Sequence, residues 1–272
     1  MRLALIGRNS FIARHVHKCA QAQGIEVTAL AHDAPSDAVQ GMDTVVNFSI
    51  DPSWFSQAYR TDRDCDLRAA RAAAHAGAHF VMCSTRRVYP DHARFPGREG
   101  TPANGDETVY GRNKAVSESA VLAAANGACT ILRLSNISGP EHGITGRRQG
   151  FFAQMLASLH RDGVIRFDMS PATRRDFLPV EICAQGILLA ARDRPAATLN
   201  LGSGTPTRCG NLAQWIMEGF GRGTLVVTDN TARDEFFLDM AVWRSHFPRF
   251  PLPDENALKD LCINLGRELR DA

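Results

Sequence analysis

The sequence has few of the features that mark membrane, secreted or nucleic-acid-binding proteins. No apolar run approaches the roughly 20 residues of a membrane span, and no stretch resembles a signal peptide. Lys and Arg number 31 against 29 Asp and Glu, a net charge of +2 that implies no polyanionic partner. We therefore expect a cytoplasmic protein that binds neither membrane nor nucleic acid.

Closely spaced cysteines are also missing. The seven cysteines are scattered, with no Cys-x-x-Cys and no His/Cys cluster at metal-ligand spacing. This distribution indicates reduced thiols and argues against a disulfide framework or any metal site. What is present is ordinary globular usage, 44% hydrophobic and 22% charged over 272 residues, which is enough to bury a large core.

Tyrosine is scarce as well, at three residues, and one of them has a suggestive neighbour. Tyr110 stands four positions before Lys114, so on a helix the two share a face. A lysine ammonium this close stabilises a phenolate and lowers the pKa of the tyrosine from about 10. Such a phenol can exchange a proton with a sugar or alcohol oxygen. The alternative is a solvated pair on a helix surface.

The N-terminus predicts a dinucleotide-phosphate site. An apolar run at 2–6 predicts a buried strand, Gly7 follows it, and a helical pattern extends to Gln23. Backbone N–H groups and the helix dipole at such a turn face a pyrophosphate. Gly7, Ser10 and Ala13 keep the spacing of Gly-x-x-Gly-x-x-Gly, with the two smallest substitutes for the later glycines. The alternative is a strand–turn–helix without a ligand.

Strand and helix patterns alternate along the chain. Strands are predicted at 2–6, 26–31, 44–48, 79–84, 130–134 and 197–201, and helices at 10–23, 53–76, 109–126, 149–161, 179–192 and 209–220. This alternation predicts an α/β fold with a parallel sheet covered on both faces. The basic residues of 53–76 are expected on a solvated face, because the aromatic platforms of a nucleic-acid site are missing.

Several motifs follow one another in a recognisable order. They are Ser84-Thr85-Arg86-Arg87-Val88-Tyr89, Tyr110-Gly111-Arg112-Asn113-Lys114, Arg133-Leu134-Ser135-Asn136-Ile137-Ser138-Gly139-Pro140, Arg175-Asp176-Phe177 and Leu199-Asn200-Leu201-Gly202-Ser203-Gly204. Together with the first turn they extend over nearly the whole chain. On these motifs the sequence resembles the extended short-chain dehydrogenase/reductase family, the nucleotide-sugar epimerases and dehydratases.

The resemblance implies a Rossmann-type doubly wound parallel sheet with a smaller C-terminal substrate-binding lobe. We expect the dinucleotide-binding domain at 1–140 plus about 176–201, and the substrate-binding lobe at 141–175 plus 202–272. The resemblance makes Tyr110 the acid/base, with Lys114 on the nicotinamide ribose and Thr85 on the reacting oxygen. Ser84 is expected to be a strand-end hydroxyl that the backbone satisfies. The implied cofactor-binding residues are Gly7, Asn9, Ser10, Phe11, Ile12, His32 and Lys114, and the implied substrate-binding residues are Asn136, Arg175 and Arg233.

Departures from the family pattern narrow the chemistry. Dehydratases of this family carry Asp-Glu where this chain has Arg86-Arg87, and the GDP-fucose synthase branch carries Cys in place of Arg87. A guanidinium stays charged and cannot shuttle protons, so both chemistries are disfavoured. Redox at C4 of a nucleoside-diphosphate sugar remains, by a 4-keto reductase or a 4-epimerase. Arg86 and Arg87 could instead be salt-bridged surface residues.

The adenine side of the cofactor site is predicted to be short. Relatives place a strand and a helix after the second strand, whereas only 32–42 is available here. We expect a missing strand, an open adenine side and a weaker grip on the cofactor, which favours a reductase that releases its cofactor each turnover. Ala31 stands where NAD-specific relatives carry Asp, and His32 with Arg8 favours NADP. Asp33 could reverse that preference, and His32 could be a solvated loop residue.

Further expectations concern the lobe and the assembly. The resemblance puts Arg175 at the substrate pyrophosphate, although the neighbouring Arg174 could be the ligand instead. The alternative for Arg175 is a surface ion pair with Asp176 or Glu181. Residues 142–150 are predicted to form a substrate loop.

The resemblance implies a homodimer through 53–76 and 109–126. A catalytically silent nucleotide-binding scaffold is a further alternative, which the shortened adenine side favours and the Thr85, Tyr110 and Lys114 set opposes.

Overall fold

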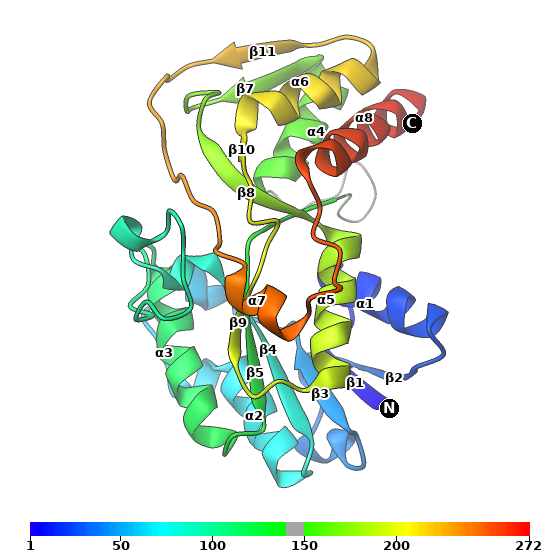
Figure 1. Cartoon of the computed structure of the whole chain (residues 1–272), viewed down its shortest axis with the longest axis vertical. Helices are drawn as coiled ribbons and strands as arrows, with labels where there is room; N and C mark the ends of the chain where they lie inside the picture. The colour runs from blue at the N-terminus through cyan, green and yellow to red at the C-terminus, as the bar shows by residue number, and fades with distance from the viewer. Residues whose placement is uncertain (140–149) are drawn as a thin grey trace. The chain divides into compact units, whose positions relative to one another are not determined.

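The computed structural model describes residues 1–139 and 150–272 (Figure 1). Pro140 and most of the predicted substrate loop lie outside the described residues. The chain forms two compact units, one of 1–134, 181–201 and 239–250, the other of 135–180, 202–238 and 251–272. Residues 239–250, which the sequence assigned to the second lobe, therefore cluster with the first unit.

The first unit is built on a six-stranded, all-parallel sheet in the order β2-β1-β3-β4-β5-β9. Its strands are β1 Arg2–Ile6, β2 Glu26–Leu30, β3 Thr44–Asn47, β4 His79–Thr85, β5 Cys129–Leu134 and β9 Thr198–Leu201. All six predicted strands are present within one residue at either end. The predicted α/β class with a doubly wound parallel sheet is confirmed.

Helices cover both faces of this sheet (Figure 1). They are α1 Phe11–Ala22, α2 Cys65–His75, α3 Val109–Ala124 and α5 Val180–Asp193, with the short α7 Ala241–His246 beside β9. Figure 1 shows α2 and α3 on one face and α1 and α5 on the other. Alternate strand residues such as Val45 and Phe80 pack against the alanines of α2. Small side chains on α2 let it lie close to the sheet.

Two expectations about the first unit have opposite outcomes. Only a 3₁₀ turn, Ser36–Val39, separates β2 from β3, so the predicted missing strand is confirmed and β2 is a sheet edge. The single helix predicted at 53–76 is wrong. Two 3₁₀ turns, Pro52–Phe55 and Thr61–Arg63, precede α2, because the Asp64 carboxylate accepts the Leu67 N–H and starts the helix there.

The described part of the second unit, without residues 140–149, holds two small sheets and three helices. The strands are β6 Asn136–Ser138, β8 Arg174–Pro179 and β10 Pro206–Arg208 in one sheet, with β7 Val164–Phe167 and β11 Thr224–Val227 in the other. The helices are α4 Phe151–Asp162, α6 Cys209–Phe220 and α8 Glu255–Asp271. Gly219 and Gly266 let α6 and α8 touch, since a Cβ on either would lie within 2.2 Å of a carbonyl oxygen of the other helix. These strands and α8 were not predicted.

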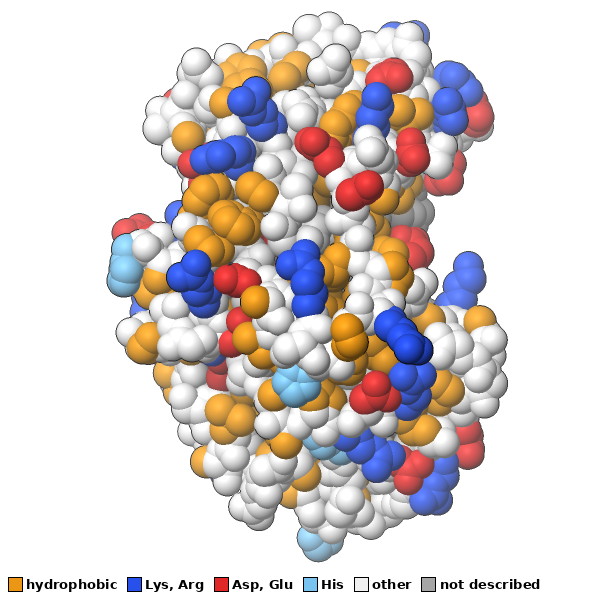
Figure 2. Space-filling view, viewed as in Figure 1, with side chains coloured by type: hydrophobic (Ala, Val, Ile, Leu, Met, Phe, Trp, Pro, Cys, Tyr) orange, Lys and Arg blue, Asp and Glu red, His pale blue; other side chains and the backbone are white. Residues whose placement is uncertain are grey.

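Surface chemistry agrees with the balanced composition. Figure 2 shows Lys and Arg interspersed with Asp and Glu over the face drawn there. Within 1–139 and 150–272, no helix is long and apolar enough to cross a membrane. In the same residues no three His, Cys, Asp or Glu side chains gather as a metal site. All seven cysteines are free thiols.

Candidate active site

The site begins where the strand order reverses. The chain runs from β1 outward to β2 and then returns to β3 on the other side of β1, and ligands of open α/β sheets bind at such a point. Gly7 follows β1 with φ +87°, and a Cβ there would lie 2.8 Å from Ser49 Oγ and 3.0 Å from Ser49 N. The two backbones thus approach closely because residue 7 has no side chain. Gly7 thus holds the turn after β1 tightly against the segment after β3, which places the start of α1 directly above the end of β1.

The first turn of α1 suits an anion. Ser10 stands at the N-cap, its side chain makes no cap hydrogen bond, and the first turn carries no acidic residue. First-turn N–H groups and the helix dipole therefore remain to attract negative charge. Asn9 is exposed and Ile12 is half-buried, while the buried Phe11 packs edge-on against His15. These residues fit a dinucleotide; their individual roles stay predictions.

The structure brings the three predicted catalytic residues together. Thr85 is the last residue of β4, and its side chain hydrogen-bonds Tyr110 of α3. One turn further along α3, Lys114 is only 4% exposed. A solvated helix pair is therefore the wrong interpretation of Tyr110 and Lys114. The Thr85 hydroxyl and the Tyr110 phenol are thus in contact, and the Lys114 ammonium is close enough to lower the pKa of Tyr110.

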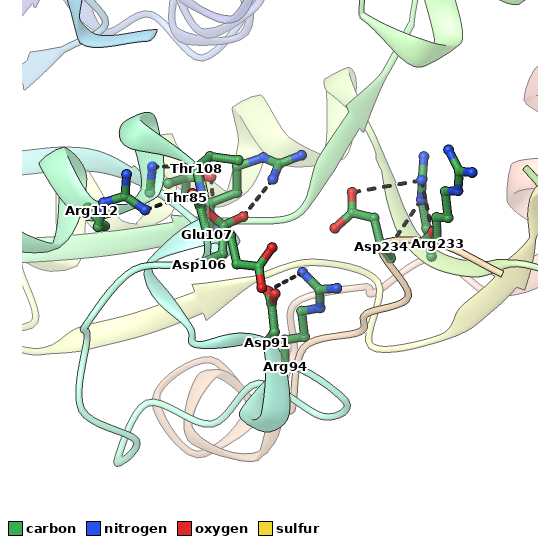
Figure 3. Close-up of polar contacts among 12 residues, drawn as sticks. Thr85, Asp91, Arg94, Asp106, Glu107, Thr108, Arg112, Arg233 and Asp234 are labelled. Atoms are coloured by element: carbon green, nitrogen blue, oxygen red, sulfur yellow. Dashed lines mark hydrogen bonds and ion pairs between the residues drawn. The ribbon is translucent and has the colours of Figure 1, made fainter. Parts of the chain in front are cut away.

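A buried carboxylate that the sequence did not reveal fixes the start of α3. Asp106 accepts hydrogen bonds from the Thr108 hydroxyl and, at 3.0 Å, from the Thr108 N–H (Figure 3). Its other oxygen lies 2.6 Å from Arg87 Nη1. Gly111 is needed beside it, since a Cβ there would lie 2.3 Å from Asp106 Oδ1. Asp106 thereby ties the loop after β4 to the helix that carries Tyr110.

Arg86 and Arg87 have different surroundings. Arg87 is 30% exposed and pairs with Asp106, which confirms the salt-bridge alternative for that residue. Arg86 is 4% exposed, so placing it on the surface is wrong. The positive charge of Arg87 lowers the pKa of Tyr110. The Arg87 side chain thus belongs to the electrostatic surroundings of the phenol.

The pKa of Tyr110 does not move as the sequence suggested. Burial raises it above the ordinary value of about 10, and this effect outweighs the lowering by Lys114. The Asp66 carboxylate adds to the rise, while the Thr85 hydrogen bond and Arg87 oppose it. The expected net lowering is therefore wrong in sign, although Lys114 acts in the expected direction. The phenol is held as a proton donor.

Lys114 is anchored by groups from two other elements. Its Nζ donates to Asp66 Oδ2 at 2.7 Å and to the Cys83 carbonyl at 3.0 Å. Asn47 Nδ2 donates to the other Asp66 oxygen at 2.7 Å. Burial favours the neutral amine, but Asp66 and Tyr110 hold the pKa of Lys114 above its ordinary value. Sequence reasoning missed Asp66 and Asn47, which no motif marks.

Ser84 belongs to a separate network. Its Oγ donates to Glu118 Oε1 at 2.5 Å, so the expected backbone partner is wrong. Glu118 also pairs with Arg133 at 2.7 Å, and the Arg133 guanidinium lies 4.8 Å from the ring centre of Tyr89. Successive strand residues face opposite sides, which separates Ser84 from Thr85. Only Thr85 of the two can serve the Tyr110 side.

The open edge beside β2 holds the adenine-side candidates. His32 is 76% exposed, and its Nδ1 lies 4.0 Å from Asp33 Oδ1. Arg68 of α2 donates to the His32 carbonyl at 2.8 Å. A small cavity here is lined by residues that include Ile6, Leu30, His32, Pro35, Cys65 and Arg68. Arg68 was missed, since its nearness to β2 follows only from the absent strand.

The predicted substrate residues lie in the second unit. Arg175 Nε donates to the Asp234 carbonyl at 3.1 Å and Arg175 Nη2 to the Arg233 carbonyl at 3.1 Å, so these residues are neighbours. Arg175 pairs with Asp234 at 3.8 Å, and the alternative pairs with Asp176 or Glu181 are wrong. Arg233 pairs with Asp229 and is 53% exposed; Figure 3 labels Arg233 and Asp234.

Two other motif residues of this unit have clear positions. Asp176 is fully buried and accepts from the N–H groups of Ser203, Gly204 and Leu238, which gives it a structural role. Asn136 is half-buried on β6, beside Phe177 of β8. Roles of Asn136, Arg175 and Arg233 in substrate binding stay predictions.

Comparison with known proteins agrees with this geometry. Residues 3–202 match the NAD dependent epimerase/dehydratase family, and the chain belongs to that family. It is 26% identical over 258 residues to a dTDP-6-deoxy-L-talose 4-dehydrogenase (NAD(P)(+)) of Kitasatospora kifunensis, covering 81% of this chain and 79% of that protein. It is 30% identical over 138 residues to a dTDP-L-rhamnose 4-epimerase of Burkholderia thailandensis, covering 47% of this chain and 38% of that protein.

Solved structures share the fold. The UDP-glucose 4-epimerase of Thermotoga maritima, solved with UDP-glucose, superposes with a TM-score of 0.82 at 18% identity, over 98% of this chain and 99% of that chain. The fold agrees with the family match, by which the chain is an NAD-dependent nucleotide-sugar-modifying enzyme of the epimerase/dehydratase type.

Proposed function

We propose that this enzyme is an NAD(P)-dependent oxidoreductase acting at C4 of a nucleoside-diphosphate sugar, and that it works as a 4-keto reductase. The observation that carries the proposal is the set of Thr85, Tyr110 and Lys114, together with the two arginines that directly follow Thr85 in the sequence. Tyr110 supplies one proton-transfer group, and Arg86 and Arg87 supply none. One proton-transfer group suffices for a ketone–carbinol conversion, whereas dehydration needs more.

The residues act in one concerted step. A nicotinamide cofactor, held by the turn after β1, by the first turn of α1 and by Lys114, would supply a hydride to C4 of the keto sugar. Tyr110 gives its phenolic proton to the C4 oxygen, so the C=O double bond becomes a carbinol. The Thr85 hydroxyl donates a hydrogen bond to the same oxygen, where negative charge develops. Lys114 stabilises the phenolate that remains until solvent returns the proton. The reverse sequence oxidises the carbinol.

The choice of reductase over 4-epimerase rests on the edge beside β2. An epimerase keeps its reduced cofactor while the sugar rotates, whereas a reductase exchanges cofactor each turnover. The missing strand leaves the adenine side open, which favours exchange. Over 81% of its length the chain is similar to a 4-dehydrogenase (NAD(P)(+)), and this similarity also favours the reductase. The 4-epimerase stays the second candidate, supported by the half-length match to a 4-epimerase.

We infer a preference for NADP from the arginine and histidine side chains at the same edge. His32 and Arg68 lie together at the end of β2, and Arg8 follows Gly7. Guanidinium and imidazole groups suit a 2′-phosphate, while Asp33 opposes it. Calorimetric titration with NADP and NAD tests this without turnover. Arg68→Ala is expected to weaken NADP roughly tenfold and NAD little. Equal losses for both cofactors would contradict the preference.

The enzyme is further proposed to be a homodimer through α2 and α3.

We also propose that the second unit binds the nucleotide sugar through Arg175, Arg233 and Asn136. Arginine suits a pyrophosphate because its planar fork donates two parallel hydrogen bonds. Arg175 is already oriented by two backbone carbonyls and by the Phe151 ring, 5.1 Å from its guanidinium carbon.

The decisive experiment combines binding and turnover. A thermal-shift screen of NAD, NADP and UDP-, GDP- and dTDP-sugars identifies ligands, since native-state ligands raise apparent stability. Stoichiometric cofactor consumption with a 4-keto sugar then supports the reductase. Tyr110→Phe should lower kcat by about 10²–10⁴ and leave cofactor affinity unchanged. Tightly held cofactor and epimer interconversion without net consumption would establish the epimerase, and no turnover with any sugar would favour the silent scaffold.

A further inference from the structure

A buried chain of polar contacts lies behind the candidate catalytic lysine. Lys114 is 4% exposed and its partner Asp66 is 2% exposed. Lys114 Nζ lies 2.7 Å from Asp66 Oδ2, and Asn47 Nδ2 lies 2.7 Å from Asp66 Oδ1. Asn47 ends β3, Asp66 lies in the first turn of α2 and Lys114 lies on α3. One carboxylate therefore joins three elements next to the reaction centre.

Such an arrangement is costly unless every charge is paired. Taking two charges out of water is repaid only by good geometry and by further hydrogen bonds on the same groups. Here each Asp66 oxygen accepts one hydrogen bond. The Cys83 carbonyl oxygen accepts a second hydrogen bond from the Lys114 ammonium, at 3.0 Å. Two of the three N–H groups of the ammonium therefore form hydrogen bonds within the protein. The direction of the remaining proton is fixed by these two anchors.

The carboxylate also acts on the phenol. The charged and titratable groups around this cluster are Lys114, Tyr110, Asp66, Asp64, Cys83 and Arg87. Burial raises the pKa of Tyr110, Lys114 and Arg87 lower it, and Asp66 raises it. Asp66 therefore cancels part of the effect of the lysine. Asp64, the N-cap of α2, faces different groups from Asp66, since its carboxylate accepts hydrogen bonds from the Tyr59 hydroxyl, the Leu67 N–H and the Ser117 hydroxyl.

We propose that Asp66 is a positioning residue of the reaction, which fixes the Lys114 ammonium beside Tyr110 and restrains how far that ammonium favours the phenolate. The proposal rests on the proposed function of Tyr110 as the acid/base. In carbonyl reduction the phenol must be protonated before it acts. A carboxylate that keeps the proton on Tyr110 at neutral pH therefore suits the reductive direction.

The test removes the charge and keeps the shape. Asp66→Asn leaves an oxygen that can accept from Lys114 but no negative charge, so the pKa of Tyr110 is expected to fall. In carbinol oxidation, which needs the phenolate, the rising limb of kcat/KM against pH then moves to lower pH. At a fixed pH on the wild-type limb the rate rises roughly threefold to tenfold. Ketone reduction needs the protonated phenol, so the falling limb of its kcat/KM against pH also moves to lower pH.

A matched control comes from the same stretch of chain. Asp62 is four residues away, 64% exposed and paired with Arg60, so Asp62→Asn makes the same chemical change outside the cluster. It is expected to leave both pH profiles unchanged. Asp66→Ser, a smaller neutral side chain with an acceptor hydroxyl, should shift the profiles in the same direction as Asp66→Asn and serves if that variant does not fold. Unshifted profiles in the folded Asp66 variant would overturn the proposal.

A second measurement separates this proposal from the proposed function. The chain has only three tyrosines, so carbon-13 labelling of the tyrosine ring gives three NMR signals that Tyr→Phe variants assign. The Tyr110 signal should titrate at lower pH in Asp66→Asn or Asp66→Ser than in the wild type. This readout needs no substrate, so it stands even if no sugar is turned over. Identical Tyr110 titrations would overturn the charge effect of Asp66 whatever the activity.

Discussion

The Phe55 ring lies stacked on the Tyr110 ring, with centroids 5.0 Å apart and planes inclined by 21°. Phe55 is 61% exposed, an unusual state for a phenylalanine, and it ends a 3₁₀ turn that no sequence motif announced. The phenol is thus covered on one face by an aromatic side chain that itself faces water. This contact keeps water from that face and contributes to the burial that raises the pKa of Tyr110.

Replacing Phe55 by Ala should reduce kcat/KM by about threefold to tenfold, since such ring pairs contribute about 0.5–1.5 kcal/mol beyond area burial. The more hydrated phenol should also have a lower pKa. Steady-state kinetics across pH measures both effects. Phe55→Tyr keeps the stacked ring and should retain most activity. If both variants behaved like the wild type, the stacked ring would have no part in catalysis.

Substituting Gly111 should disrupt the start of α3. A Cβ at residue 111 would lie 2.3 Å from Asp106 Oδ1 and 2.4 Å from the Arg87 carbonyl oxygen. Gly111→Ala is expected to lower the free energy of unfolding by about 1–3 kcal/mol, because neither neighbour can move without breaking its own hydrogen bonds. Chemical denaturation measures the loss, and kcat should fall as Tyr110 moves.

Gly100 provides the control for that variant. A Cβ there would meet nothing within 4 Å, so Gly100→Ala should leave both stability and activity within error. Equal stability of Gly111→Ala and Gly100→Ala would show that the Asp106 contact can relax, and would remove Asp106 as the anchor of the helix.

Sequence alone predicted the sheet well, because buried parallel strands are short apolar runs whose pattern is local. It predicted one helix over 53–76 because local composition could not show that Asp64 begins α2. It left out α8, although Leu258, Cys262, Leu265 and Leu269 carry a helical spacing and Asp254 a cap. In that case the signal was present in the sequence.

The candidate site divides in the same way. Thr85, Tyr110 and Lys114 could be found because they follow fixed spacings within a recognised pattern. Asp66 and Asp106 could not, since their roles arise only when elements 48 and 19 residues away fold against them. The burial of Tyr110 could not be predicted from the sequence either, and for this reason the direction of its pKa shift was predicted wrongly.

A histidine outside the site should set the acid limit of stability. His79 Nε2 lies 2.8 Å from Thr130 Oγ1, and Thr130 donates to the Pro195 carbonyl. Burial lowers the pKa of His79 to about 4. In the unfolded chain a histidine has a pKa of about 6.5 and takes up its proton more readily. The native state therefore binds fewer protons, and stability falls as pH drops from about 6.5 towards 4.

His79→Gln should remove that part of the pH dependence. The wild type is expected to lose up to about 2 kcal/mol more than the variant between pH 7 and pH 4, after allowance for partial solvation. Urea denaturation at several pH values gives the comparison. His75→Gln, an exposed histidine at the end of α2, should follow the wild-type curve. Parallel curves for wild type and His79→Gln would contradict the assignment.

The proposed homodimer makes a prediction about α3. Val116 is 48% exposed and Leu122 is 49% exposed, and an open groove between α2 and α3 is lined by residues that include Leu67, Val116 and Ala120. A carboxylate in this face would be desolvated without a partner in a dimer, so Val116→Glu should produce a monomer of about half the wild-type mass in light scattering. Val242→Glu, at a valine 37% exposed on α7, is the matched control and should leave the mass unchanged. A wild-type protein that is monomeric at micromolar concentration would exclude α2 and α3 as a stable interface.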